Sequence, residues 1–338
     1  MTLLALVLAA PAAQKSSDTS PKTSETSAPQ KSSDTSAKPR RALPADAIIT
    51  LTHADDPWAG DPRVGTYTSA TRGFSTNSFW LEGPTGLVLI DAQFLPSAAL
   101  EAVDFAERAT GKKVVLAIVL HANPDKFNGT LALKSRGIRV VTSAQVRALI
   151  PAVFEKRTRA FKSRFEDEWP KDVPLPDSFG DKTTTLEAAG LKLTAHVLGH
   201  GCSDAHVVIQ WDAPPRVGDG DPATHLFVGD LVANGSHSWL ELGHTDEWHQ
   251  RLDDLAALEP DYIHPGRGPS GDARLLAQEH KYLNEFSAVV ATEHPKGALD
   301  DATRGRLLEK LDAQFPQHRF GAFLEVGVGA EWARQAAR

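Results

Sequence analysis

Cysteine is almost absent from this sequence of 338 residues, with Cys202 as its single example. One cysteine cannot build a framework of disulfides within the chain, and it cannot build a zinc module that depends on several thiolates. Any metal site in this chain must therefore be built from histidine and aspartate side chains.

The sequence also lacks an excess of positive charge. It contains 36 Lys and Arg against 43 Asp and Glu, which gives a net charge of -7. No cluster of basic residues stands out, so we expect no nucleic-acid partner. Neither a Gly-x-Ser-x-Gly nucleophile motif nor a glycine-rich phosphate loop is present, which argues against a serine hydrolase and a nucleotide site.

A long hydrophobic run is missing as well. The opening stretch MTLLALVLAAPAA, residues 1–13, is apolar but too short to span a bilayer, so we expect no stable membrane insertion. Its small terminal residues are typical of a secretory signal, and we expect the protein to be exported to the periplasm or outside the cell. Residues 14–42 repeat the segment QKSSDTS and are too polar to fold, so they predict a disordered tether.

Residues 43–338 have the composition and length of one large domain. Strand and helix patterns alternate there, which predicts an α/β layered fold. The expected strands are 76–83 and 86–93, joined as a hairpin, then 113–121, 191–201, 204–211 and 224–235. The expected helices are 97–111, with Ser97 as its cap and Gly111 as its end, then 245–260, 270–291 and terminal helices within 300–338.

Polar residues recur where the expected strands run into loops. They are His121, Asp125, His200, Asp230, His264 and Arg267. The carboxyl ends of strands in open α/β sheets are where ligands bind, so these residues are expected to converge on one site.

The motifs HANPDKFNG, LGHG, FVGD and PGRG stand in this order, and Asp91 ends the run LVLID. In kind and order they resemble the metallo-β-lactamase superfamily, over residues of about 47–270. The resemblance implies a four-layer αβ/βα sandwich and hydrolase activity.

The metal ligands of that family are only partly matched. The family's His-x-His-x-Asp-His motif and its later histidines and aspartate hold two zinc ions. The resemblance implies that a first zinc site keeps His121, His200 and Asp230, with Asn123 where a histidine is usual. The second site keeps Asp125 but has Lys126 and Arg267 in place of histidines, and these cations offer a metal no lone pair. We expect both cations to lie within reach of Asp125 or Asp230 and to neutralise these carboxylates without metal.

Two functions remain open. The first is a hydrolase with one zinc ion per chain, acting on a small ester, lactone, amide or similar acyl compound. Asp125 and Asp230 would orient a metal-bound water, while Lys126 and Arg267 would stabilise negative charge on the substrate. The alternative is a metal-free member that binds a small anionic ligand or a partner protein, because the same two cations suit an anion.

Other candidate ligands are kept in reserve. His206 is expected to be a histidine of the core or its rim. His237 and His264 are the expected substitutes for a missing ligand, and Cys202 is expected to be a small buried residue or a soft ligand.

Overall fold

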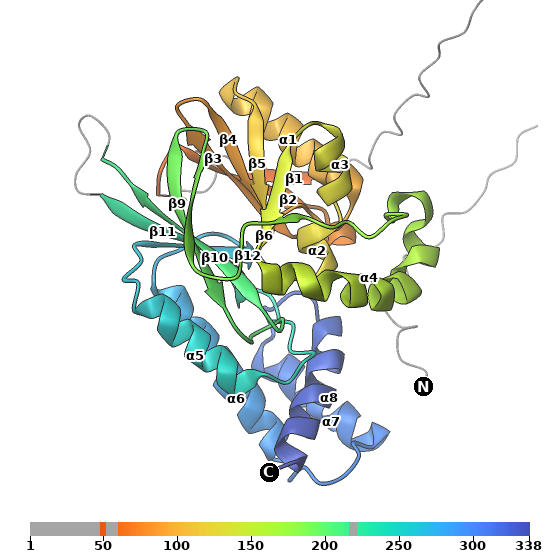
Figure 1. Cartoon of the computed structure of the whole chain (residues 1–338). Coiled ribbons are helices and arrows are strands. Elements are labelled where there is room, and N and C mark those ends of the chain that lie inside the picture. The colour runs from red at the N-terminus through yellow and green to blue at the C-terminus, as the bar shows by residue number, and fades with distance from the viewer. Residues whose placement is uncertain (1–47, 52–59, 216–221) are drawn as a thin grey trace, which may run out of the picture. The chain divides into compact units, whose positions relative to one another are not determined.

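The computed structural model describes residues 48–51, 60–215 and 222–338 (Figure 1). The expected export signal at 1–13 and the expected tether at 14–42 lie outside the described residues, and both stay predictions. Among the described residues, no helix is long and apolar enough to cross a membrane.

Seven strands form the first sheet, in the order β1-β2-β3-β4-β5-β6-β7. They are β1 (Ile48–Leu51), β2 (Val64–Ser69), β3 (Asn77–Gly83), β4 (Gly86–Ile90), β5 (Val114–Ile118), β6 (Arg139–Thr142) and β7 (Asp177–Ser178). Strands β1 to β4 pair antiparallel, whereas β4 to β7 pair parallel. The expected hairpin is confirmed, with Phe79 opposite Ile90 and Gly83 opposite Gly86.

Five strands form the second sheet, in the order β12-β11-β10-β9-β8. They are β8 (Thr184–Ala188), β9 (Leu191–Leu198), β10 (His206–Ala213), β11 (Ala223–Ala233) and β12 (Tyr262–Arg267). All neighbours are antiparallel except β11 and β12.

The helices are α1 (Pro96–Thr110), α2 (Pro124–Phe127), α3 (Thr130–Ser135), α4 (Ala144–Phe165), α5 (Thr245–Ala256), α6 (Arg274–Ala291), α7 (Asp301–Gln314) and α8 (Ala322–Ala336). Short 3-10 turns lie at Thr71–Gly73 and Glu166–Glu168. The predicted Ser97 cap of α1 is wrong, because Pro96 already occupies the first turn and the Ser97 hydroxyl donates to Glu168 instead. The predicted end at Gly111 is confirmed by its left-handed φ of 71°.

Helices cover the outer faces of two packed sheets, as Figure 1 shows. Helix α1 lies against the first sheet, and α5 and α6 lie against β11 of the second. Between the sheets the rings of Phe79 and Phe227 meet edge to face, with centroids 5.4 Å apart. The predicted four-layer sandwich is confirmed, and it brings the carboxyl ends of β4, β5, β11 and β12 to one site.

Candidate functional site

The site residues lie at or near the ends of four strands. Asp91 follows β4, and its Oδ1 accepts a hydrogen bond of 2.9 Å from the backbone N–H of Leu120, just after β5. The short helix α2 carries Asp125 and Lys126. Asp230 lies in β11, and Arg267 ends β12. We call Asp91, Asp125, Asp230, Lys126 and Arg267 the charge cluster; all of them are buried.

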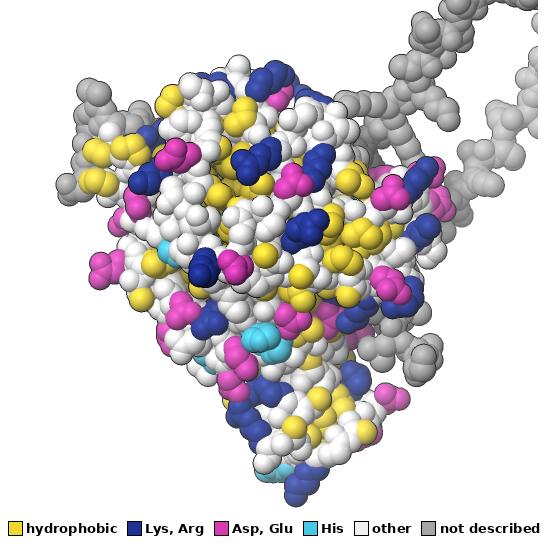
Figure 2. All heavy atoms as spheres, in the orientation of Figure 1, with side chains coloured by type: hydrophobic (Ala, Val, Ile, Leu, Met, Phe, Trp, Pro, Cys, Tyr) yellow, Lys and Arg dark blue, Asp and Glu magenta, His cyan; other side chains and the backbone are white. Residues whose placement is uncertain are grey.

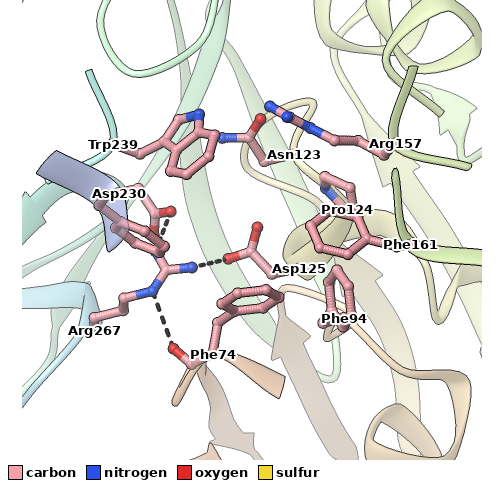
Figure 3. A pocket seen from close by; sticks show the side chains of 11 residues that line it. Phe74, Phe94, Asn123, Pro124, Asp125, Arg157, Phe161, Asp230, Trp239 and Arg267 are labelled. Carbon is pink, nitrogen blue, oxygen red and sulfur yellow. Dashed lines mark hydrogen bonds and ion pairs between the residues drawn. The ribbon is translucent and has the colours of Figure 1, made fainter. Parts of the chain in front are cut away.

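The two cations of the charge cluster lie among its three carboxylates. Lys126 Nζ is 3.0 Å from Asp230 Oδ1 and 3.5 Å from Oδ2 of both Asp91 and Asp125. Arg267 Nη2 donates to Asp125 Oδ2 at 2.7 Å, and Nη1 donates to Asp230 (Figure 3). The sequence-based prediction that these cations compensate the aspartates is confirmed.

Burial and charge fix the protonation states within the charge cluster. Burial would raise the pKa of Asp230, but Arg267 and Lys126 hold that pKa well below its usual range. Burial would lower the pKa of Lys126, but the three aspartates raise it, so the ammonium keeps its proton. Burial raises the pKa of Asp91 to about 7 against the opposing effect of Lys126. The charge cluster is therefore close to neutral without any metal.

A second zinc ion of the family type does not fit this arrangement. Both oxygens of Asp230 face cations, Oδ1 towards Lys126 and Oδ2 towards Arg267. The packing is tight on the side of Gly266, where an added Cβ would lie 1.9 Å from Asp230 Oδ1 and 2.9 Å from Lys126 Nζ. A divalent ion beside the oxygens of Asp230 would be repelled by both cations.

His121 adjoins the charge cluster on its buried side. Its Nε2 lies 3.7 Å from Asp230 Oδ2 and 4.0 Å from Cys202 Sγ. Burial lowers the pKa of His121 to about 4, so the imidazole is neutral near pH 7.

His206, rather than His200, lies next to His121 and Cys202. An isolated bridge pairs the backbones of His121 and His206, and their rings lie 5.4 Å apart. His206 Nδ1 donates to the Gly199 carbonyl at 2.9 Å, so its unprotonated Nε2 faces Cys202 Sγ at 3.2 Å. His206 is buried, as expected, but it supplies the second imidazole of this region, which the sequence motifs did not indicate.

The structure does not bring His200 together with His121 and Asp230. Its side chain is 50% exposed and lies beside Asp204 and His244. Of the reserve ligands, His264 bonds Ser270 and His225, and His237 bonds Tyr282. The contacts of these residues lie outside the charge cluster, and the zinc site at His121, His200 and Asp230 stays a prediction.

A pocket with a cavity volume of about 60 Å³ opens over the charge cluster, within about 410 Å³ of atom-free space that includes open solvent. Aromatic rings and polar side chains surround it (Figure 3). The lining residues are Phe74, Phe94, Asn123, Pro124, Asp125, Arg157, Phe161, Asp230, Trp239, Arg267 and Phe323. The aromatic residues come from loops and from α4 and α8, and no motif in the sequence marked them.

The cations that line this pocket already have carboxylate partners. Arg157 donates to Glu241 through both of its terminal nitrogens and stacks on Trp239 at 5.1 Å. Asp125 Oδ2 accepts hydrogen bonds from Thr76 and Arg267, and Figure 3 shows its other oxygen directed away from Arg267. The pocket thus combines aromatic walls with a nearly neutral polar floor.

Outside the pocket, basic and acidic side chains alternate over the face drawn in Figure 2. The expected absence of a nucleic-acid partner stays a prediction.

Comparison with solved structures identifies the architecture. A metallo-β-lactamase from Pontibacter korlensis superposes with a TM-score of 0.52 at 19% identity, over 70% of this chain and 99% of that one. The DIM-1 metallo-β-lactamase gives a TM-score of 0.53 at 18% identity, over 70% and 97%.

Sequence comparison agrees. A metallo-β-lactamase type 2 of Bacillus cereus is 25% identical over 208 residues, which are 60% of this chain and 70% of that protein. The β subunit of a 2,4-dinitroanisole O-demethylase of Nocardioides sp. (strain JS1661) is 26% identical over 226 residues, 65% of this chain and 61% of that protein. The profile of the metallo-β-lactamase superfamily matches residues 71–267. The chain therefore belongs to the metallo-β-lactamase superfamily of hydrolases.

Proposed function

We propose that this member of the superfamily works without a zinc pair and binds a small, uncharged aromatic molecule in the pocket. The observation that carries the proposal is the pairing of Lys126 and Arg267 with the aspartates that would otherwise hold metal. With these charges compensated, nothing in the charge cluster requires a divalent ion.

The pocket walls indicate the class of ligand. The rings of Phe74, Phe94 and Phe161 meet edge to face, with centroids 4.8 to 5.9 Å apart, and present apolar surface to the opening. An aromatic ligand gains both buried area and ring contacts there. Because Arg157 and Arg267 already have carboxylate partners, an uncharged ligand suits the pocket better than the anion expected from the sequence. The relative named as a 2,4-dinitroanisole O-demethylase subunit points to the same substrate class.

Asp125 is the group best placed to act on a bound molecule. One of its oxygens is fixed by Thr76 and Arg267, which leaves the other to accept a hydrogen bond from a ligand or from a water beside it. Arg267 holds this carboxylate in position through a hydrogen bond of 2.7 Å. The pocket therefore supports the binding of a small aromatic molecule. Hydrolysis of that molecule would require Asp125 to activate a water beside it.

A second candidate rests on a separate observation. The neutral imidazoles of His121 and His206 and the thiol of Cys202 adjoin one another beside Asp230. These residue types suit one zinc ion, which would supply a bound water of lowered pKa for hydrolysis.

Equilibrium dialysis with 2,4-dinitroanisole tests the first proposal. Phe161→Ala removes a wall of the pocket, and we expect its affinity to fall about fivefold or more, since a lost ring contact costs about 1 kcal/mol or more. Phe105→Ala is the matched control, because Phe105 is also half-buried on a helix but packs on Tyr67 outside the pocket. Equal binding by both variants would contradict the proposed site.

A metal assay separates the two candidates. Protein purified without chelator should contain no zinc in the charge cluster, and binding should survive EDTA. Hydrolysis of 4-nitrophenyl acetate that disappears with EDTA, returns with zinc and is lost in His206→Ala would support the one-zinc hydrolase instead.

A further inference from the structure

His200, Asp204 and His244 form a separate cluster on the surface. His200 follows β9, and Asp204 stands in the same loop, two residues before β10. His244 lies immediately before α5, at the end of the loop at 234–244. The cluster therefore joins the β9–β10 loop to the loop at 234–244.

The three side chains converge on a small volume. Asp204 Oδ1 is 3.4 Å from His200 Nδ1 and 2.9 Å from His244 Nε2, and the two imidazole rings lie 4.3 Å apart. One possible ligand atom from each residue lies within 4.8 Å of the ligand atoms of the other two. Among the described residues, no other group of three His, Cys, Asp or Glu side chains lies as close together. Ligand atoms around a tetrahedral zinc ion, with bonds of about 2.0 Å, stand roughly 3.3 Å apart. Small side-chain rotations would bring the cluster to that geometry.

We propose that His200, Asp204 and His244 bind one zinc ion, with water in the remaining position. Two imidazoles and a carboxylate are a typical zinc donor set. His200 and Asp204 are 50% and 45% exposed, so an ion can enter from solvent. In the charge cluster, by contrast, the carboxylates of Asp125 and Asp230 already face the cations Lys126 and Arg267.

The position of this zinc site gives it a structural role near the pocket. The loop at 234–244 carries Trp239, which lines the pocket, and Glu241, which holds Arg157. A zinc ion on His244 fixes the end of this loop to the β9–β10 loop. Zinc thus stabilises one wall of the pocket without contacting the ligand.

Calorimetric titration of the untagged full chain with zinc chloride tests the proposal. We expect one equivalent of zinc to bind, with a rise in the melting temperature. His244→Ala and Asp204→Asn should each lower the affinity at least tenfold. His196→Ala is the matched control, since His196 is a partly buried histidine bonded to Gln210, and it should bind zinc as the unaltered protein does. Circular dichroism checks that each variant is folded.

Cobalt provides a second readout that does not depend on stability. Bound Co²⁺ should show the visible absorption of a tetrahedral site in the unaltered chain and lose it in His244→Ala. Absence of saturable zinc binding would overturn the proposal. So would binding that persists in His244→Ala and Asp204→Asn but disappears in Cys202→Ser, because the ion would then lie at the buried imidazoles.

Discussion

Replacement of Lys126 by methionine tests whether the charge cluster substitutes for metal. Lys126 is fully buried, and its ammonium lies 3.0 Å from one carboxylate and 3.5 Å from two more. At an effective dielectric constant of about 20, the closest of these pairs alone corresponds to roughly 5 kcal/mol of Coulomb attraction. Desolvation of the ammonium and repulsion from Arg267 offset part of the total. Removal of one partner from a buried ion pair costs about 3–5 kcal/mol, and we expect Lys126→Met to lose that much stability.

Urea unfolding at pH 7 measures this loss. Lys113→Met is the control, because Lys113 pairs with Glu107 at 2.6 Å but is 79% exposed. An exposed pair contributes less than about 1 kcal/mol, so the control should unfold almost as the unaltered protein does. A loss below about 1 kcal/mol in both variants would refute the view that Lys126 neutralises the buried carboxylates.

The pH dependence of Lys126→Met provides an independent check. Without the ammonium, the pKa of Asp91 rises further above its already raised value of about 7. The folded variant then holds a proton that the unfolded chain releases above its ordinary aspartate pKa, so its stability increases as the pH falls from about 7 towards 4. Asp91 of the unaltered protein takes up its proton near pH 7 and follows nearly the same course below that pH, whereas above pH 7 only the variant keeps the proton. The difference in stability between the two proteins should therefore widen as the pH rises from 7 to 9, and a difference that stays constant over that range would contradict the assignment.

Three further predictions concern the stability of the fold. Burial lowers the pKa of His121 to about 4 and that of His206 to about 3, so below about pH 6.5 the unfolded chain binds protons that these folded imidazoles do not. Their contribution to stability should be lost as the pH falls from 6.5 to 4.5, and urea titration of His206→Gln should show a smaller loss. Gly266→Ala should cost at least about 2 kcal/mol, because its Cβ would stand 1.9 Å from a carboxylate oxygen, whereas Gly305→Ala, with no atom within 4 Å of its Cβ, should be neutral or stabilising. Deletion of residues 1–40 should leave the melting temperature nearly unchanged, since residues 1–13 are expected to be an export signal and residues 14–40 lack apolar positions that could join a core.

The strands and the charge cluster were predictable from the sequence because both depend on short-range features. Apolar runs bounded by turn residues located β3, β4 and β5. The polar residue that ends such a run marks the carboxyl edge of a sheet, which identified Asp125, Asp230 and Arg267 before any coordinate was known. The pairing of cations with aspartates followed from the cost of burying uncompensated charge.

The tertiary structure decided which imidazole joins His121. His200 and His206 stand six residues apart, and the glycine-flanked motif favoured His200. The backbone bridge between His121 and His206 turns His206 inward, while the loop that carries His200 leaves it in solvent beside Asp204. Only contacts between segments distant in sequence determine which side chain is buried, and a motif carries no such information.

The pocket likewise depended on the assembled fold. Phe74, Phe161, Trp239 and Phe323 come from four segments, and no motif in the sequence marked any of them. Each is an ordinary apolar residue within its own segment, and it becomes part of a binding wall only when α4, α8 and two loops pack over the strand ends. The sequence by itself determined the layered fold and the compensated charges of the site. Tertiary packing alone determined the shape of the cavity above them, because that shape is a property of surfaces from several segments and not of any one of them.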